Sequence, residues 1–280
     1  MLYRVHLVFF AFFLSECRGR QITVQNISSA TGDSKSLENF VFDLKFSIGS
    51  VSGKDLSNPI ELSKTATPSP VQYVTDGDWT VVFKAQSLTG ISPFEIYNSK
   101  GIRNEIRGSY PESCAALAKV PGCFTPYRTG LIDEWEKLDV QQVRFLIIIN
   151  SDTCTKREVI FDGRLSTNTN WFTKERVLSS TWTDLTANQT YNLFSFNGIQ
   201  DARVNRHWSI SHNFGGCPND RAWFTTSFYP PTGCRFDKRK SAMPNFVVCP
   251  GTKMCNMQRE SINADAFAIM IKAKNKLPEQ

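Results

Sequence analysis

The amino-acid sequence predicts an all-β protein, mainly antiparallel, built as a single β-sandwich or jelly-roll-like domain with disulfide loops and one or two short helices. Three observations lead to this fold class. Short segments rich in β-branched and aromatic residues recur, turn-forming residues separate them, and no strand–helix unit is repeated. An α+β, fibrinogen-like fold is the alternative, because the strand predicted at Trp79 is followed by a cysteine-bounded loop.

The first residues predict a secretory signal peptide over residues 1–17. A short basic start precedes an apolar run at 7–14, and Ser15 and Cys17 are the small residues that a cleavage site requires. This run is too short to cross a bilayer, and no later run is longer. We therefore expect a secreted protein without a membrane span.

The rest of the chain predicts one β-rich domain over residues 37–273, between a flexible arm at 18–36 and a polar tail at 274–280. The arm carries a glycosylation sequon at Asn26. Apolar and polar residues alternate over 40–48, which predicts a first strand with one buried and one exposed face.

Later strands are predicted from their composition. Trp79–Lys84 is rich in β-branched and aromatic residues. Val143–Ile149 is almost continuously apolar, which predicts a central strand covered on both faces, and Glu158–Phe161 completes a hairpin with it. Short helical segments are expected near 93–97 and at 170–178. Further strands are predicted at 193–196, 207–211, 223–228, 246–248 and 267–271.

Cysteine usage predicts a disulfide framework. Eight cysteines become seven if Cys17 leaves with the signal peptide, and an oxidising compartment favours pairing. Spacing does not fix connectivity, and the shortest loops leave Cys154 unpaired or intermolecular, with a disulfide-linked dimer as one consequence. Zinc is disfavoured because no Cys-x-x-Cys pair occurs. The expected pairs are Cys114 with Cys123, Cys217 with Cys234, and Cys249 with Cys255.

The formal net charge of +6 comes from Lys and Arg residues scattered along the sequence. A nucleic-acid partner is not expected, because such proteins collect their cations on one face. Lys238-Arg239-Lys240 is the one tight basic cluster, and a solvated loop, a processing site and a glycosaminoglycan contact are its three interpretations.

Asp76 and Asp78 flank Gly77 before the Trp79 strand and are weak candidates for calcium ligands. A turn that leads into a strand explains the same residues. Asn188-Gln189-Thr190 is the second glycosylation sequon and predicts a surface loop there.

Four of the six tryptophans lie between residues 170 and 228. Aromatic residues at this density predict the centre of a core. A ligand face for a sugar is the sharper alternative, in which Trp208 and Trp223 form an aromatic wall. Its polar members would be Asn213, Asn219 and Asp220, which turn geometry also explains.

No reaction and no cofactor are predicted. After the signal peptide, His207 and His212 are the only histidines, and no nucleophile elbow, phosphate loop, dinucleotide fingerprint or His-Glu-x-x-His pattern is present. We therefore expect a protein that is not an enzyme and has no catalytic residues.

Several phrases resemble a secreted domain of marine invertebrates such as corals and molluscs, some members of which occur in the organic matrix of skeletons and shells. The similarity covers residues 70 to 273, and the family has no known catalytic residues to transfer. The phrases are Asn170-Trp171-Phe172, Ser179–Leu185, Phe194-Ser195-Phe196, Asn213–Asp220 and Trp223-Phe224.

This resemblance implies a biomineral-associated matrix component, with matrix proteins or glycans as partners. Mineral-templating proteins often carry acidic runs, and this chain has none. A structural or adhesive role is therefore expected in preference to mineral nucleation. A soluble lectin-like protein is the alternative function.

Overall fold

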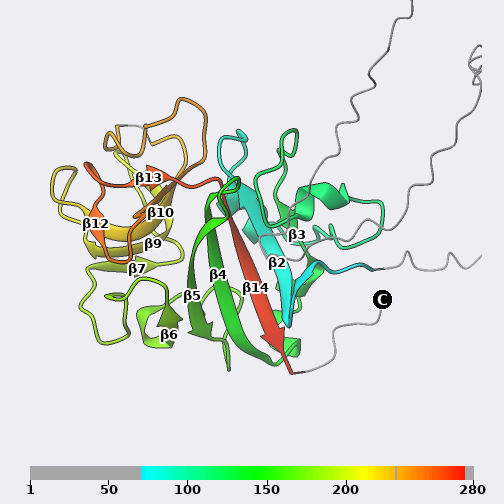
Figure 1. Ribbon diagram of the computed structural model, residues 1–280. Helices are drawn as coiled ribbons and strands as arrows, with labels where there is room; N and C mark the ends of the chain where they lie inside the picture. Colours follow the sequence, from blue (N-terminus) through cyan, green and yellow to red (C-terminus); the bar gives the residue numbers. More distant parts are fainter. Residues whose placement is uncertain (1–70, 231, 275–280) are drawn as a thin grey trace, which may run out of the picture. The chain divides into compact units, whose positions relative to one another are not determined.

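The computed structural model describes residues 71–230 and 232–274, which belong to one compact unit, Pro68–Gln280. Two antiparallel sheets dominate this unit (Figure 1). The prediction of an all-β fold is confirmed. The predicted signal peptide, flexible arm and first strand lie outside the described residues, as does the tail after Lys274.

The first sheet has the strand order β1-β2-β14-β4-β5-β6, and β3 also pairs with β2. β14 comes last along the described chain, yet it lies in the middle of the sheet between β2 and β4 (Figure 1). Ile269 of β14 is opposite Phe83 of β2 on one side and Phe145 of β4 on the other. The strands are β1 (Thr75–Asp76), β2 (Trp79–Gln86), β3 (Tyr127–Arg128), β4 (Val140–Asn150), β5 (Thr155–Asp162), β6 (Val177–Ser180) and β14 (Ala266–Ala273).

The composition of β4 explains its central place. Val143, Phe145 and Ile147 point to the main core, and Leu146 packs into a second apolar cluster with Met270. A strand apolar at successive positions buries both faces. The central strand predicted from this run is therefore confirmed, and so is the hairpin that it forms with β5.

The second sheet has the order β13-β11-β10-β9-β7, with β12 paired to β10 and β8 paired to β9. Its long strands contain the predicted segments at 207–211 and 246–248, and the segment predicted at 223–228 is a strand up to Ser227. The strands are β7 (Leu193–Ser195), β8 (Ile199–Gln200), β9 (Asn205–Asn213), β10 (Arg221–Ser227), β11 (Asn245–Val248), β12 (Cys255–Asn256) and β13 (Ile262–Asn263).

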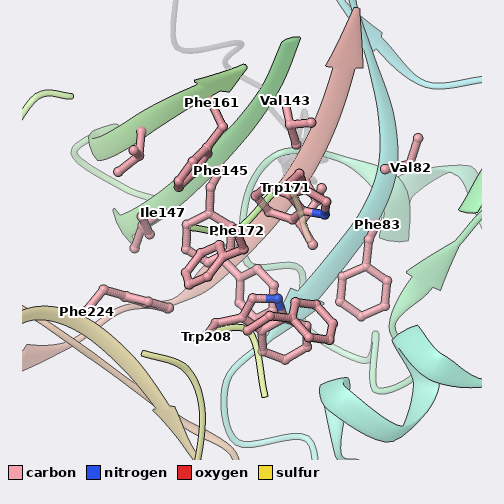
Figure 2. Packing of buried hydrophobic residues seen from close by; sticks show 14 of the residues in the cluster. Val82, Phe83, Val143, Phe145, Ile147, Phe161, Trp171, Phe172, Trp208 and Phe224 are labelled. Atoms are coloured by element: carbon pink, nitrogen blue, oxygen red, sulfur yellow. The ribbon is translucent and has the colours of Figure 1, made fainter. Parts of the chain in front are cut away.

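One aromatic core joins the two sheets. The ring of Phe224 in β10 lies 5.2 Å from that of Phe145 in β4, and Phe246 in β11 lies 4.9 Å from Phe267 in β14. Figure 2 shows Phe83, Phe145, Phe224 and other core side chains gathered in one cluster. Each fully buried aromatic side chain contributes about 1.5–3 kcal/mol, so this cluster is the main source of stability.

The opposite face of the first sheet is covered by the segment around the Cys114–Cys123 disulfide. Ala115 packs into the second apolar cluster with Val81 of β2. Lys84 of β2 is 1 % exposed beneath this segment, and its Nζ donates a hydrogen bond to Cys114 O at 2.9 Å. The disulfide loop thus seals one face of the sheet.

Helices are short. Pro93 occupies the first turn of α1 (Pro93–Asn98), and the Ser92 side chain caps it by accepting a hydrogen bond from Glu95 N. Because the helical content is this small, the fold is all-β, and the α+β, fibrinogen-like alternative is wrong. The 3₁₀ helices are η1 (Glu112–Ala115), η2 (Gly130–Ile132), η3 (Trp135–Lys137) and η4 (Lys174–Arg176).

All three predicted disulfides are present: Cys114–Cys123, Cys217–Cys234 and Cys249–Cys255. Each closes a short loop, as the spacing argument required. Cys154 lies at the turn between β4 and β5 and is disulfide-bonded as well. The sequence predicts that Cys154 is unpaired or intermolecular, and its bonded state corrects the first of these two alternatives.

Candidate functional site

The predicted aromatic wall does not exist as a surface. Trp208 and Trp223 are both 0 % exposed and belong to the main core. Trp208 lies among the core side chains (Figure 2). Its ring centroid is 5.1 Å from that of Phe267 in the opposite sheet. The core interpretation of these tryptophans therefore replaces the sugar-stacking one.

The reason lies in the path of β9. Trp208 has a φ of +43°, and the pairing of β9 with β10 shifts in register here. Such a bulge re-aims side chains, and Trp208 and Ile210, two residues apart, lie on the same face of β9. Trp208 and Ile210 both join the core, and Trp223 of β10 is anchored there by donating its indole N–H to Asp184 at 2.7 Å.

The polar members of the predicted face do reach a concave surface. Asn213 and Asn219 line an open cavity of about 450 Å³, which we call the Asn213 cavity. Arg221 and Arg259 add two cations to its lining. The other lining residues are Gly215, Pro218 and Asn256.

Asp220 is not part of that lining. It is 2 % exposed, and its carboxylate accepts a hydrogen bond from Arg206 Nη1 at 3.1 Å. Arg206 also holds Asp237 through two hydrogen bonds, from Nε at 2.8 Å and from Nη2 at 2.6 Å. Asp220 is therefore a structural partner, in contrast to its predicted role on a ligand face.

The Arg206 guanidinium lies between two aromatic rings, at 4.6 Å from the centroid of Phe236 and 5.2 Å from that of Phe214. Burial alone would lower the pKa of Arg206, but the hydrogen bonds and charges of Asp237 and Asp220 raise it above its ordinary value. This network links β9 to the two loops that the Cys217–Cys234 disulfide joins.

A larger open cavity, of about 960 Å³, lies over the β10–β11 loop and the β12–β13 connection. We call it the Arg239 cavity. Asp237, a member of the Arg206 network, fixes the β10–β11 loop through two hydrogen bonds. Its carboxylate accepts one from the backbone N–H of Cys234, and its backbone carbonyl accepts the other from Asn245 Nδ2. The lining residues are Arg235, Lys238, Arg239, Lys240, Gln258, Arg259, Ser261, Ile262 and Asn263.

Arg259 reaches its place through a local turn. The side-chain oxygen of Asn256 accepts hydrogen bonds from the backbone N–H groups of Gln258 and Arg259, at 3.0 and 3.1 Å. Asn commonly directs the chain in this way. The turn places Arg259 in the lining of both cavities, so the two are contiguous.

Arg239 is fixed at the base of the larger cavity. Its guanidinium donates hydrogen bonds to the carbonyl and the hydroxyl of Ser261. Burial, together with the nearby charge of Arg235, lowers its pKa below the ordinary value. Among the described lining residues, several positive charges lie close to one another and none is a carboxylate.

The sequence singled out the cluster 238–240 but not Arg221, Arg235 or Arg259. These residues are separated along the chain, and only the pairing of β10 with β11 and β12 brings them together. The expectation of scattered cations therefore does not hold for this side of the second sheet. No local sequence signal could have shown it.

The two weak calcium candidates face cations. Asp76 pairs with Arg144 at 2.8 Å, and Asp78 pairs with Lys272 at 3.6 Å. Within residues 71–230 and 232–274, no three metal-ligating side chains gather into a group that would hold a metal ion. Their observed role is to tie β1 and its turn to the sheet.

The two histidines have unrelated surroundings. His207 stacks on Phe94 at 3.7 Å between centroids, and its Nδ1–H donates to Asn197 O at 2.7 Å. Burial lowers its pKa below the ordinary value. His212 lies against Trp223 instead. Each histidine thus packs against its own aromatic neighbour.

Asn188 is exposed in the turn after Trp182, where the sequon predicted a surface loop. Asn26 lies outside the described residues. In the described part of the chain, no helix combines the length and the apolar character needed to cross a bilayer.

No family model, no curated protein and no solved structure matches the chain. The two contiguous cavities are therefore the candidate functional site on physical grounds.

Proposed function

We propose that this chain is a secreted, non-enzymatic component of an extracellular matrix, with a structural or adhesive role. The observation that carries the proposal is the set of three short-range disulfides on a two-sheet scaffold. Structural disulfides persist in oxidising compartments and are rare where thiols are kept reduced.

The surface supports an adhesive role. The described part of the chain presents a rigid second sheet whose loops are held by the Cys217–Cys234 disulfide and by the Arg206 network. A binding surface on a fixed scaffold loses little conformational entropy when a partner binds. The resemblance to a domain of skeletal and shell matrices makes a mineralised matrix the first place to look.

The alternative of a soluble lectin keeps no support from the tryptophans, because both are buried. Glycan recognition would have to use the polar and cationic cavities. Glycan recognition by these cavities is compatible with a matrix role.

Secretion and glycosylation are tested by expressing the full chain in a secreting animal cell line. We expect the protein in the medium, with a mobility that N-glycosidase treatment increases. Asn188→Gln is expected to remove one glycan, because Asn188 is exposed. Asn197→Gln, an exposed asparagine outside any sequon, is the control and is expected to change nothing. Intracellular retention of unglycosylated protein would contradict the proposal.

Residence in a matrix is tested on the native protein, by mass spectrometry of demineralised skeletal matrix beside body fluid from the source animal. Recovery chiefly in the matrix is the expected result. Recovery in fluid alone would remove the matrix role and leave a soluble secreted protein.

A further inference from the structure

The Asn213 cavity and the Arg239 cavity together form one continuous cationic surface, which we call the basic surface. They share Arg259, and the described residues that line them include six Lys and Arg residues but no Asp or Glu. The acidic neighbour in sequence, Glu260, is engaged elsewhere, since its Oε2 accepts the Asn256 N–H at 2.7 Å.

The cations of this surface are largely available to a ligand. Among the described residues, Arg235, Lys240 and Arg259 are exposed and take part in no ion pair. Like charges held together without counterions are relieved by an anion, and planar guanidinium groups match the oxygens of sulfate and carboxylate.

Two orphaned polar atoms in the same lining point to a second kind of group. Gln258 Oε1 and Asn263 Oδ1 are buried and accept no hydrogen bond from any described residue. Asn263 is held in place because its Nδ2 donates to Asn245 at 2.7 Å. Buried acceptors without partners are costly, and rotation of these side chains into the cavity would let the hydroxyl groups of a ligand satisfy them.

The cavity linings also exclude two classes of ligand, those that bind mainly by stacking on aromatic side chains. Among the residues that the structure describes, no aromatic side chain lines either cavity. Single-stranded nucleic acids and neutral sugars are held mainly by stacking on aromatic rings, so neither fits. Two adjoining cavities of about 450 and 960 Å³ suit an extended chain better than a single small anion.

We propose that the basic surface binds a linear anionic polysaccharide. Its acidic groups pair with Arg235, Lys240 and Arg259, and its hydroxyl groups donate to Gln258 and Asn263. The inference rests on the proposed extracellular function and gives it a partner class. Sulfate esters and uronic carboxylates share the chemistry required, and the test separates them.

The test measures binding of the purified full-length protein to immobilised heparin, which is sulfated, and to hyaluronan, which carries carboxylates alone. We expect affinity for at least one of them that falls as salt rises. The triple variant Arg235→Gln/Lys240→Gln/Arg259→Gln should bind about tenfold to a hundredfold more weakly, at roughly 0.5–1 kcal/mol for each exposed charge. Its salt dependence should also be shallower.

A matched control carries the same change in net charge on other elements. Lys100→Gln/Arg107→Gln/Lys137→Gln replaces three exposed cations outside both cavities. It is expected to bind like the unsubstituted protein. Equal losses in both triple variants, or no binding of either polysaccharide, would overturn the proposal.

A neutral substitution separates a sugar site from a general polyanion site. Gln258→Met removes one orphaned acceptor without changing charge. It should weaken binding of the polysaccharide severalfold while leaving binding of inorganic polyphosphate, which has no sugar hydroxyls, unchanged. If Gln258→Met changes the binding of neither the polysaccharide nor polyphosphate, the surface is a non-specific anion binder and the proposal fails. Secretion and residence in a matrix are measured separately, so failure here leaves the proposed function standing.

Discussion

Arg206→Met is expected to destabilise the protein by about 3–5 kcal/mol, the largest effect of any single substitution considered. The guanidinium is 3 % exposed and is the cation that compensates the buried carboxylates of Asp220 and Asp237. Removing one member of a buried ion pair leaves charge without a partner, which costs that much. Urea denaturation of the disulfide-intact protein measures the change in the free energy of unfolding.

Arg203→Met is the matched control. Arg203 is exposed and pairs with Asp201 at 3.5 Å, so its loss should cost at most about 1 kcal/mol. Asp237→Asn provides a milder test of the network, since it keeps the shape of the side chain but removes its charge. A loss below about 1 kcal/mol in Arg206→Met would show that the network does not hold the loops of the basic surface.

Lys84 should make the stability of the protein depend on pH. Its ammonium group is buried under the Cys114–Cys123 segment, and burial lowers its pKa from 10.5 to about 7. Between these values the unfolded chain binds a proton that the folded protein does not, so stability rises with pH across this window. Below about pH 7 and above about 10.5 the contribution is constant.

Unfolding free energies at pH 7 and pH 9 test this account. Relative to Lys84→Met, the unfolding free energy of the unsubstituted protein should rise by about 2 kcal/mol between pH 7 and pH 9. One proton contributes roughly 1.4 kcal/mol for each pH unit, and the total is smaller than twice this value because the folded protein is still partly protonated near pH 7. Using the difference between the two proteins removes the contribution of other titrating groups.

Lys272→Met is the control for Lys84, since Lys272 lies on the neighbouring strand β14, is 36 % exposed and pairs with Asp78. We expect its stability to follow that of the unsubstituted protein from pH 7 to pH 9. Parallel profiles for Lys84→Met and the unsubstituted protein would mean that the buried amine does not titrate in this range.

Much of the fold could be predicted because its signals are local. The apolar run Val143–Ile149 required a strand buried on both faces, and short cysteine spacings gave all three described disulfides. The central place of β14 could not be predicted in this way, because the register with β2 and β4 is a long-range property.

The candidate site was predicted only in part. Asn213 and Asn219 were assigned to a ligand face and do line a cavity, but the aromatic wall assigned with them is buried. Trp208 shares the core-facing side of β9 with Ile210, and the alternation of the sequence does not show which face of this strand is buried. Arg235 and Arg259 approach each other only after two loops have folded.

The place of β14 has a consequence for the order of events during synthesis. β2 and β4 do not pair with each other; each pairs with β14, so the middle of the first sheet is empty until residues 266–273 have left the ribosome. Closing contacts between such distant segments is slow. The three short disulfide loops, with separations of 9, 17 and 6 residues, need no such wait. Each of these disulfides can therefore form as soon as its own loop has emerged, while the first sheet, one face of which the Cys114–Cys123 loop covers, assembles only after its last strand has been translated.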